Sequence, residues 1–478
     1  MKSINLYSIV IRLHVLIIAI TVVGVFYVIA IGQTDYLIAF LTLPLINLLL
    51  IPLTRRDEKF DPSHPIIMIL ASLVIGTVLR SFFIISPLQS NAKDLMLLGK
   101  PPTILIGGII CIYIGIICFL LGYTYSVSPL SDWSSKKIFH IKINMKKFIP
   151  VAMLITMISL VVAWYHYKTL GVNFSDVSNI SQKRFVKTDA GDYAASGYDH
   201  LFMGLVEPVF YIMLIYLIQK KKSVFSILGL YVFFLGFLNV LYPFIDSSRT
   251  GALYVLINTG LVIFYIKGGI KIRHIVWTLS TAMFLLIMMT VLRHKSNRVD
   301  PNITDNSPLI IMVGSLNFLG VDKTAQIIEN VPDKMNYQFG KTLFLWTVAP
   351  IPRTMWHDKP EISIGRVIGE KIYEKRTEDT AAGGVPPGFI GELYLNFGYL
   401  GVIAGMFVLG LALKLYYNAF KKVRVQSPFA MVIYLLAFLP FELNLIGGDL
   451  SRMIVNLLIT IIPLYVILKL TQSKQRIA

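Results

Sequence analysis

The chain contains 478 residues, of which 55% are hydrophobic and only 15% are charged, and its mean hydropathy is +0.70. This composition excludes an ordinary soluble protein. The net charge of +18 does not require a nucleic-acid partner. In a membrane protein, basic loops that face the cytoplasm and its anionic lipids account for such an excess.

Long apolar segments recur along the chain and are joined by polar loops. An apolar run of about 17 residues or more can cross a hydrocarbon core of about 30 Å as a helix. We therefore predict an all-α, multi-pass membrane protein with about twelve transmembrane helices, the first a retained anchor rather than a cleaved signal peptide. The predicted spans are residues 13–31, 36–53, 66–85, 103–126, 148–165, 201–218, 225–242, 252–266, 275–292, 397–417, 429–446 and 453–470.

The charge of the loops predicts the orientation of these spans. Short, basic connections form one set: the N-terminus, 54–65, 127–147, 219–223, 267–274, 421–428 and the C-terminal tail. The other set begins with a loop that has no basic residue and comprises 32–35, 86–102, 166–200, 243–251, 293–396 and 447–452. Because basic loops stay on the cytoplasmic side, both termini are expected in the cytoplasm and the second set outside.

The outward set divides the sequence into three parts. Residues 1–292 form a nine-span bundle with an outward loop at 166–200, residues 293–396 form a large outward segment, and residues 397–478 form a three-span C-terminal part. This organisation places most of the polar chemistry on one side of the membrane.

The large outward segment is expected to contain structure of its own. Residues 309–319, 323–330 and 361–376 have the spacing of helices. Residues 343–351 are apolar but too short to span, which predicts a re-entrant or interfacial piece. The Gly/Pro-rich run at 383–388 is a candidate hinge.

Four arginines lie at or near the outer ends of predicted spans: Arg80, Arg249, Arg293 and Arg452. Several guanidinium groups at one depth suit a pyrophosphate, because guanidinium stays charged and binds phosphate oxygens in pairs. The alternative is that these long side chains reach the membrane interface, or pair with a carboxylate such as Asp449.

The stretch between Ala349 and Gly401 concentrates polar and aromatic residues. The candidates for binding phosphate and sugar in this stretch are Arg353, Lys359, Arg366, Trp356 and Tyr394. The three basic side chains suit phosphate, and the two aromatic rings can stack on sugars. The alternative for the two rings is the aromatic belt that many membrane proteins have at the interface.

Glu392 is the candidate general base, about one helical turn above the tenth predicted span. Partial burial favours this role by raising the pKa of a carboxyl group. The alternative is a structural ion pair with one of the arginines. His294 is the second candidate base, because histidine exchanges protons near neutral pH.

Several motifs are absent from the sequence. It has no GxxxxGK[ST] phosphate loop and no HExxH or paired metal-ligand motif, so neither ATP-driven transport nor a metal centre is predicted, and no cofactor is expected. The two halves show no internal repeat, and the predicted span interiors contain few ionisable residues. These two observations disfavour a transporter.

Residues 352–360 (PRTMWHDKP), residues 388–401 (GFIGELYLNFGYLG) and the Ser-Arg-Thr-Gly elbow at 248–251 resemble the bacterial Wzy-type oligosaccharide repeat-unit polymerases of O-antigen and exopolysaccharide synthesis. The many spans and the large outer segment agree with that family along most of the chain. The resemblance implies a GT-C-like membrane glycosyltransferase. It would transfer a growing glycan from undecaprenyl pyrophosphate to the next lipid-linked unit, at the outer face of the inner membrane and without a nucleotide sugar.

The resemblance also implies partners: undecaprenyl-pyrophosphate-linked donor and acceptor, membrane lipid, a chain-length-regulating co-polymerase and a flippase. In this reading the arginines hold the leaving pyrophosphate, a base takes the hydroxyl proton and the aromatic rings position sugars. Two alternatives stay open. One is an O-antigen ligase, which differs in its acceptor, and the other is a lipid-linked oligosaccharide flippase or other transporter.

Overall fold

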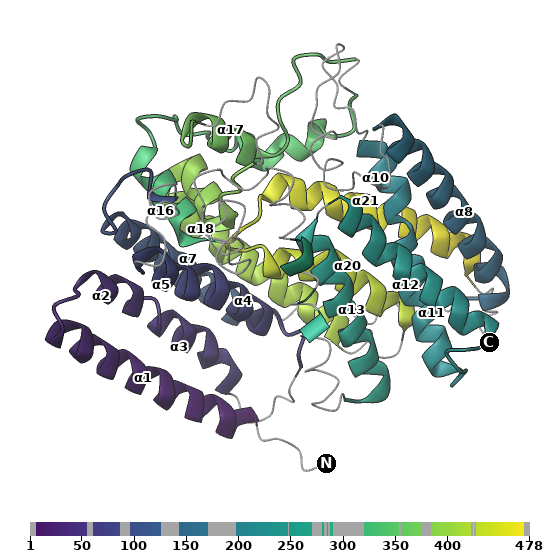
Figure 1. The fold of residues 1–478 in the computed structure, drawn as a ribbon, viewed down its shortest axis with the longest axis horizontal. Helices are drawn as coiled ribbons and strands as arrows, with labels where there is room; N and C mark the ends of the chain where they lie inside the picture. The colour runs from purple at the N-terminus through teal and green to yellow at the C-terminus, as the bar shows by residue number, and fades with distance from the viewer. Residues whose placement is uncertain are drawn as a thin grey trace.

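A computed structural model of the chain describes residues 6–54, 61–86, 96–125, 143–170, 197–269 without 247, single positions between 280 and 289, 320–374 without 353 and 354, and 384–472 without 422, 423, 425 and 426. Over these residues the regular structure is helical, apart from an isolated bridge between Ile143 and Gln472. Figure 1 shows the helices as one bundle with α17 at its upper edge.

The N-terminal helices are α1 (Leu6–Ala30), α2 (Asp35–Phe40), α3 (Pro44–Leu50), η1 (Ile51–Thr54), α4 (Pro65–Leu73), the π-helical η2 (Val74–Leu79), α5 (Arg80–Ile85) and α7 (Ile104–Thr124). The middle helices are α8 (Met145–Thr169), α10 (Gly197–Gly204), α11 (Val206–Gln219), α12 (Ile227–Ile245) and α13 (Arg249–Lys267). The remaining helices are α16 (Val321–Asn330), the 3-10 helix η6 (Lys341–Val348), α17 (Ile364–Lys371), α18 (Gly388–Lys421), α20 (Pro428–Leu443) and α21 (Leu450–Thr471).

The prediction of an all-α, multi-pass membrane protein is confirmed. Among the described residues, nine helical segments are long and apolar enough to cross a membrane, and two shorter apolar helices cover Gly251–Lys267 and Ala430–Leu443. These eleven segments coincide with predicted spans. The ninth predicted span, 275–292, lies mostly outside the described residues, so the count of twelve stays a prediction.

The N-terminal helices share one hydrophobic core with the described part of residues 293–396, the segment predicted outside, which is called the outer segment below. This core contains buried residues of α3, α4, α7, α16, α17 and α18. α1 lies at the edge of the bundle beside α2 and α3 (Figure 1). Its Val10 and Ile17 are buried, whereas Phe26 and Tyr27 are exposed. Exposed apolar side chains on such a long apolar helix are typical of a surface that faces lipid.

α7 and α18 pack closely within this core. A side-chain carbon on Gly122 of α7 would overlap the carbonyl oxygen of Phe407. A side-chain carbon on Gly410 of α18 would likewise overlap the carbonyl oxygen of Phe119. Small residues at such positions let two membrane helices approach with their backbones in contact. α7 therefore supports the helix that carries Glu392.

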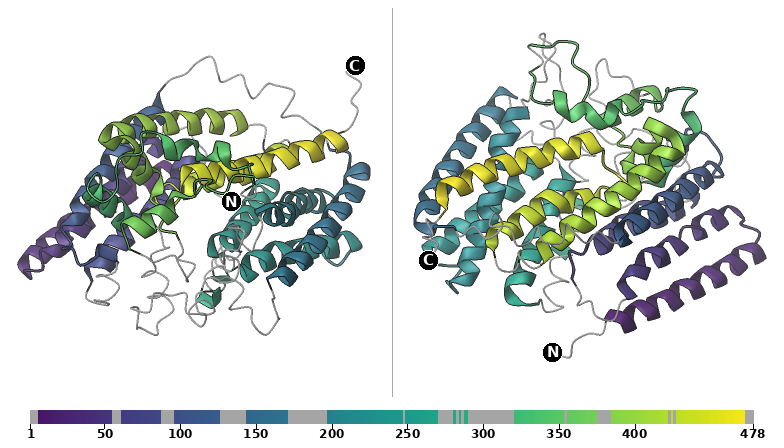
Figure 2. Two further views of the ribbon diagram at one scale, coloured as in Figure 1. Left: turned by 90° about the horizontal axis from the view of Figure 1, so that it is seen from above. Right: turned by 180° about the vertical axis from the view of Figure 1, so that it is seen from behind.

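A second hydrophobic core lies among α8, α11, α12, α13, α20 and α21. The end of α18 joins this core through Tyr417 and Phe420, so α18 connects the two cores. α21 runs from the outer segment toward the start of α8 (Figure 2), where the backbone N–H of Asn144 donates to the Thr471 carbonyl at 2.9 Å.

α18 is longer than the predicted tenth span because it begins at Gly388 rather than at residue 397. At 34 residues it would be about 51 Å long if straight, which exceeds the thickness of a hydrocarbon core. A kink divides the helix at Phe397 and Gly398, where Gly398 has a φ of 62°. The part before the kink carries Glu392, and the part after it is long enough to span.

The outer segment follows the predicted pattern where it is described. α16 coincides with the helix predicted at 323–330, and α17 is shorter than the run predicted at 361–376. The apolar piece predicted at 343–351 is the 3-10 helix η6. The helix predicted at 309–319 lies outside the described residues.

Candidate functional site

Eleven residues are predicted for the site from the sequence, and the structure describes the side chains of seven of them. Arg293, His294 and Arg353 lie outside the described residues. For Arg249 the backbone is described, at the start of α13. Of the remaining seven, Glu392 and Arg452 come together at one place, where η6, α18 and α21 meet.

Glu392 is fully buried in the first turns of α18. Its Oε1 accepts a hydrogen bond from Thr342 Oγ1 at 2.9 Å, and its Oε2 accepts one from the backbone N–H of Leu450 at 2.6 Å. Leu450 opens α21, and the N–H groups of a first helical turn favour an anion. Among the described residues, these partners are neutral, in contrast to the arginine expected for a structural ion pair.

Asn396, one helical turn after Glu392, extends this network. Its Nδ2 donates to Thr342 Oγ1 at 2.7 Å and to the carbonyl of Glu392 at 2.8 Å. Its Oδ1 accepts from the backbone N–H of Gly340 at 2.8 Å, and Ser451 Oγ donates to the carbonyl of Thr342. Buried and satisfied polar networks hold their members in one arrangement. We call this network the Glu392 junction: Gly340, Thr342, Glu392, Asn396, Leu450 and Ser451.

Asp449 and Arg452 lie beside the junction at the start of α21. Asp449 Oδ1 caps the helix by accepting from the backbone N–H of Arg452 at 2.8 Å, and its Oδ2 accepts from Ser363 Oγ at 2.8 Å. Burial raises the pKa of Asp449 above its ordinary value, although the Arg452 charge opposes this shift. The Arg452 side chain is exposed, and its guanidinium forms no ion pair with a described residue. It can therefore receive an anionic ligand.

An open pocket of about 160 Å³ lies between η6 and α17, next to the junction. Lys341 and Lys371 are exposed residues of its lining, and two ammonium groups favour an anionic ligand such as phosphate. Thr342 belongs both to this lining and to the Glu392 junction. Pockets for whole small ligands measure about 300–1,000 Å³, so this one has room for only a single group of a larger substrate.

Arg366 and Lys359 both have partners within the outer segment. Arg366 Nη1 lies 3.3 Å from Oε2 of Glu361, which also lines the pocket, and both side chains are partly exposed. The Lys359 ammonium donates to the carbonyls of Ala349 at 2.9 Å and Ile351 at 2.6 Å. Lys359 therefore holds the turn after η6 together. A phosphate-binding role for either residue stays a prediction.

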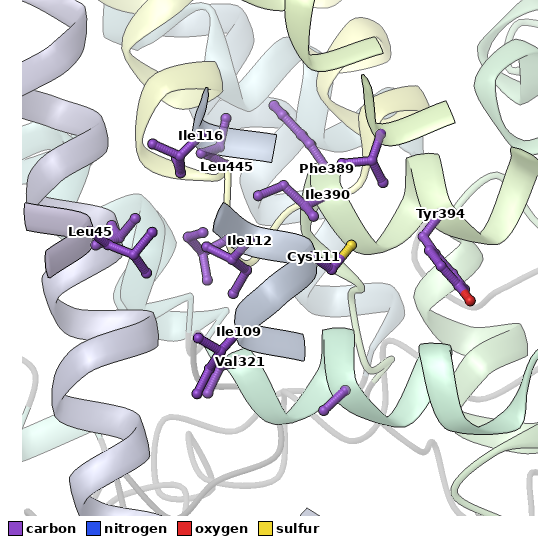
Figure 3. Packing of buried hydrophobic residues seen from close by; sticks show 14 of the residues in the cluster. Leu45, Ile109, Cys111, Ile112, Ile116, Val321, Phe389, Ile390, Tyr394 and Leu445 are labelled. Atoms are coloured by element: carbon purple, nitrogen blue, oxygen red, sulfur yellow. The ribbon is translucent and has the colours of Figure 1, made fainter. Parts of the chain in front are cut away.

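The two aromatic candidates differ in accessibility. Trp356 is 39% exposed on the turn after η6, so its ring can meet a ligand. Tyr394 is only 7% exposed and packs edge-on against Tyr399, with ring centroids 5.1 Å apart. Figure 3 shows its ring beside Cys111 and the apolar side chains of this core. Stacking on a sugar needs a free ring face, and the geometry favours Trp356 for this role.

Arg80 lies in the interior of the helical bundle and pairs there with a carboxylate. Its Nε donates to Asp322 Oδ1 at 3.0 Å and its Nη2 donates to Asp322 Oδ2 at 3.3 Å, with both side chains fully buried. The pair ties α16 of the outer segment to α5. Breaking a buried pair costs about 3–5 kcal/mol, so the described contacts favour a structural role, and pyrophosphate binding by Arg80 stays a prediction.

A second polar cluster, which no sequence motif predicts, lies where predicted cytoplasmic ends of helices meet. Arg424 pairs with Asp61 and donates to Ser63 Oγ at 2.9 Å, and Tyr417 donates to Asp61 Oδ2 at 2.7 Å. The guanidinium carbon also lies 4.7 Å from the ring centroid of Tyr265. Burial alone would raise the pKa of Asp61, but Arg424 and the tyrosine hydroxyls hold it below its ordinary value.

Comparison with known families assigns nearly the whole chain to one family. A sequence model of the family described as O-antigen polysaccharide polymerase Wzy matches residues 9–475. The match covers both hydrophobic cores and the outer segment, so it does not rest on short motifs. No curated protein and no solved structure gives a significant match to the chain.

Proposed function

Since the chain belongs to the O-antigen polysaccharide polymerase Wzy family, we propose that it acts on undecaprenyl-pyrophosphate-linked oligosaccharides at the outer face of the bacterial inner membrane. The family comprises glycosyltransferase-type polymerases of lipid-linked repeat units, and this chain is a multi-pass membrane member. In the proposed reaction, a hydroxyl of the acceptor's non-reducing sugar attacks C1 of the donor's reducing-end sugar. A C–O bond forms, the bond from C1 to the pyrophosphate oxygen breaks, a base takes the proton and undecaprenyl pyrophosphate leaves.

Contacts between loops support the grouping of loops by side that this proposal requires, because each pair joins two loops predicted on the same side of the membrane. Asp61 and Arg424 come from two loops predicted on the cytoplasmic side, and they pair with each other. Lys100 and Glu329 come from two segments predicted outside, and they also pair, at 2.7 Å. The loop charges assign the outer side to the segment that contains Lys341 and Thr342, and we place the Glu392 junction there. We propose that both termini are cytoplasmic and that the arrangement is GT-C-like with twelve spans.

The observation that carries the assignment of the site is that Thr342 lies between a cationic pocket and a buried carboxylate. We assign pyrophosphate binding to Lys341, Lys371 and the exposed Arg452. A sugar hydroxyl in the pocket gives its proton to Thr342 Oγ1 as the hydroxyl of Thr342 gives its own to Glu392. Glu392 then acts as the general base through one intervening hydroxyl, which explains how a fully buried carboxylate takes part in the reaction.

Five other predicted residues have a role in this proposal. Trp356 stacks on a sugar of the acceptor or donor, and Arg249, Arg293 and Arg353 add positive charge for the second pyrophosphate. His294 is the alternative base. The proposed partners are a flippase that delivers the lipid-linked units and a co-polymerase that sets the chain length.

Purified protein given only lipid-linked repeat units in detergent tests the reaction. We expect longer lipid-linked glycans to appear without ATP, nucleotide sugar or a membrane gradient. A deletion strain separates the polymerase from a ligase, because loss of the polymerase leaves lipopolysaccharide capped with one repeat unit and loss of the ligase leaves none. Well-folded protein that moves lipid-linked units across vesicles but never extends them would contradict the proposal.

Cysteine labelling of intact cells tests the orientation separately. A cysteine introduced at Thr304 should react with a membrane-impermeant reagent, and one introduced at Ser223 should not. The opposite pattern would overturn the proposed topology and place the junction in the cytoplasm.

A further inference from the structure

Two histidines and a carboxylate meet at the outer ends of three helices, away from the Glu392 junction. His166 comes from the last turn of α8, His200 from α10 and Asp246 from the residue after α12. One potential ligand atom from each lies within 4.8 Å of the others. α10 packs against α8 (Figure 1), and α11 connects α10 to α12 in the second core. The three side chains therefore belong to one well-packed region.

His166 has the orientation of a metal ligand. Its side chain is fully buried, and Nδ1 lies 2.9 Å from Oδ2 of Asp199. A carboxylate in that position takes the proton-bearing nitrogen of the ring and leaves the lone pair of Nε2 free to coordinate. This Nε2 is buried and has no hydrogen-bond partner among the described residues. A buried polar atom without a partner is costly, so its position requires an explanation.

The second histidine and the aspartate have a suitable separation. His200 Nδ1 lies 3.4 Å from Oδ2 of Asp246, which is long for a hydrogen bond between these groups. Two ligands that each lie about 2.0–2.1 Å from one tetrahedral ion are about 3.4 Å apart. The rings of His166 and His200 have centroids 4.9 Å apart, and with all three ligand atoms within 4.8 Å of one another, the side chains would have to move closer to share one ion.

We propose that His166, His200 and Asp246 form a binding site for a divalent transition-metal cation of the Zn²⁺ type. Two imidazoles and one carboxylate form a ligand set that Zn²⁺ accepts, whereas Mg²⁺ and Ca²⁺ prefer oxygen ligands alone. Asp199 orients His166, and the fourth position is left for water or for an oxygen of a substrate. This site is independent of the reaction assigned above, because it joins α8, α10 and α12 whatever the substrate is.

Metal binding by purified protein tests the site directly. The full-length protein is prepared with a tag that lacks histidine, stripped with EDTA, and titrated with Co²⁺ while the visible absorption is followed, and with Zn²⁺ by calorimetry. We expect one equivalent to bind, with Co²⁺ absorption typical of low coordination number. Failure of the stripped wild-type protein to bind either ion would overturn the proposal without any variant.

Variants then locate the binding. His166→Gln should abolish it, and Asp199→Asn should weaken it by about 10–100-fold, because Asp199 acts through His166. His357→Gln is the matched control, since it removes one exposed histidine of the outer segment. Equal binding by wild type and His166→Gln would show that the ion binds elsewhere and would refute the assignment.

Thermal unfolding gives a readout that does not depend on any activity. The ligands come from three helices, so an ion that binds the folded state alone should raise Tm with its concentration. The wild type and His357→Gln should show this rise, and Asp199→Asn should need about 10–100-fold more metal for it. If His166→Gln does not fold, the comparison between the wild type and Asp199→Asn still decides, and equal Tm responses of these two proteins would refute the role of Asp199.

Discussion

Removing the hydroxyl of Thr342 should slow polymerisation about as strongly as neutralising Glu392. Thr342 lines the pocket and donates to Glu392 Oε1 at 2.9 Å, so both side chains belong to the proposed path of the proton. Thr342→Val removes the hydroxyl and keeps the shape of the side chain. Thr342→Ser keeps the hydroxyl and is the matched control.

The structure separates the expected effect on stability from the effect on rate. Glu392→Gln keeps the size of the side chain, but its amide oxygen replaces only one of two acceptors. The amide nitrogen of the glutamine then faces either the backbone N–H of Leu450 or the hydroxyl of Thr342. In either orientation, one of the two hydrogen bonds that Glu392 accepts is lost. Losing one bond to a charged group costs about 1.5–3 kcal/mol of stability. Losing a general base costs about 10²–10⁴ in rate, or about 2.7–5.5 kcal/mol in the barrier.

The assay is chain extension by purified variants, with kcat and KM measured and thermal unfolding recorded for each protein. We expect kcat to fall about 10²–10⁴-fold in Glu392→Gln and Thr342→Val while KM changes little. The double variant should be no slower than either single one, because the two groups act as one unit. If Thr342→Val keeps kcat near that of the wild type while Glu392→Gln loses it, the path through Thr342 is refuted. Near-normal kcat in both variants would make the junction structural and move the search for the base to His294.

Three further predictions concern binding, pH and packing. Arg452→Ala should raise KM about 10–100-fold with little loss of stability. Arg452→Lys should recover part of the lost affinity, since lysine supplies charge without the guanidinium fork. An unchanged KM in the Ala variant would remove Arg452 from the site. Asp61→Asn should lower the free energy of unfolding by about 3–5 kcal/mol at pH 7, because it breaks a buried pair. The pKa of Asp61 in the folded protein lies below its ordinary 3.8. The stabilisation by this pair is therefore present above about pH 4 and is lost as the pH falls through the folded pKa. Thermal unfolding between pH 3 and pH 7 should show this loss of stability at low pH in the wild type and not in the variant. Gly410→Ala should reduce the yield of folded protein, because the added carbon overlaps the backbone of α7. Gly260 has open space around it, so Gly260→Ala should be neutral or slightly stabilising. Equal yields of the two variants would contradict the close approach of α7 and α18.

The spans were predictable because each depends on the composition of one continuous run. The tenth span was predicted at 397–417, which begins at the kink, but the helical segment that precedes it from Gly388 was not predicted. Glu392 and Asn396 make the first turns of this helix too polar to read as a span. Their side chains are satisfied by Thr342 and by the start of α21, partners 50 or more residues away in the sequence. A hydropathy pattern contains no information about such partners.

The candidate site was predictable as a region and only partly as a set of contacts. Arg80 was recognisable as a cation within an apolar run, but its partner Asp322 is 242 residues away. Thr342 and Lys341 carry no motif, and they become candidates only because η6 lies between α17 and the junction. The cluster of His166, His200 and Asp246 escaped notice for the same reason, since metal-ligand motifs are recognised when the ligands share one helix or loop.

The pocket is fixed to the membrane bundle at several points, and this bears on how the polymerase works. Arg80 and Asp322 tie α16 to α5, the Glu392 junction ties η6 to α18 and α21, and Ser363 and Asp449 tie α17 to α21. Groups held in this way need little reorganisation when substrate binds. Positioning and electrostatic stabilisation accelerate a transfer most when the groups are already in place. If the proposed assignment holds, the described part of the outer segment is a preorganised wall of the site, to which the lipid-linked substrates bring their sugars.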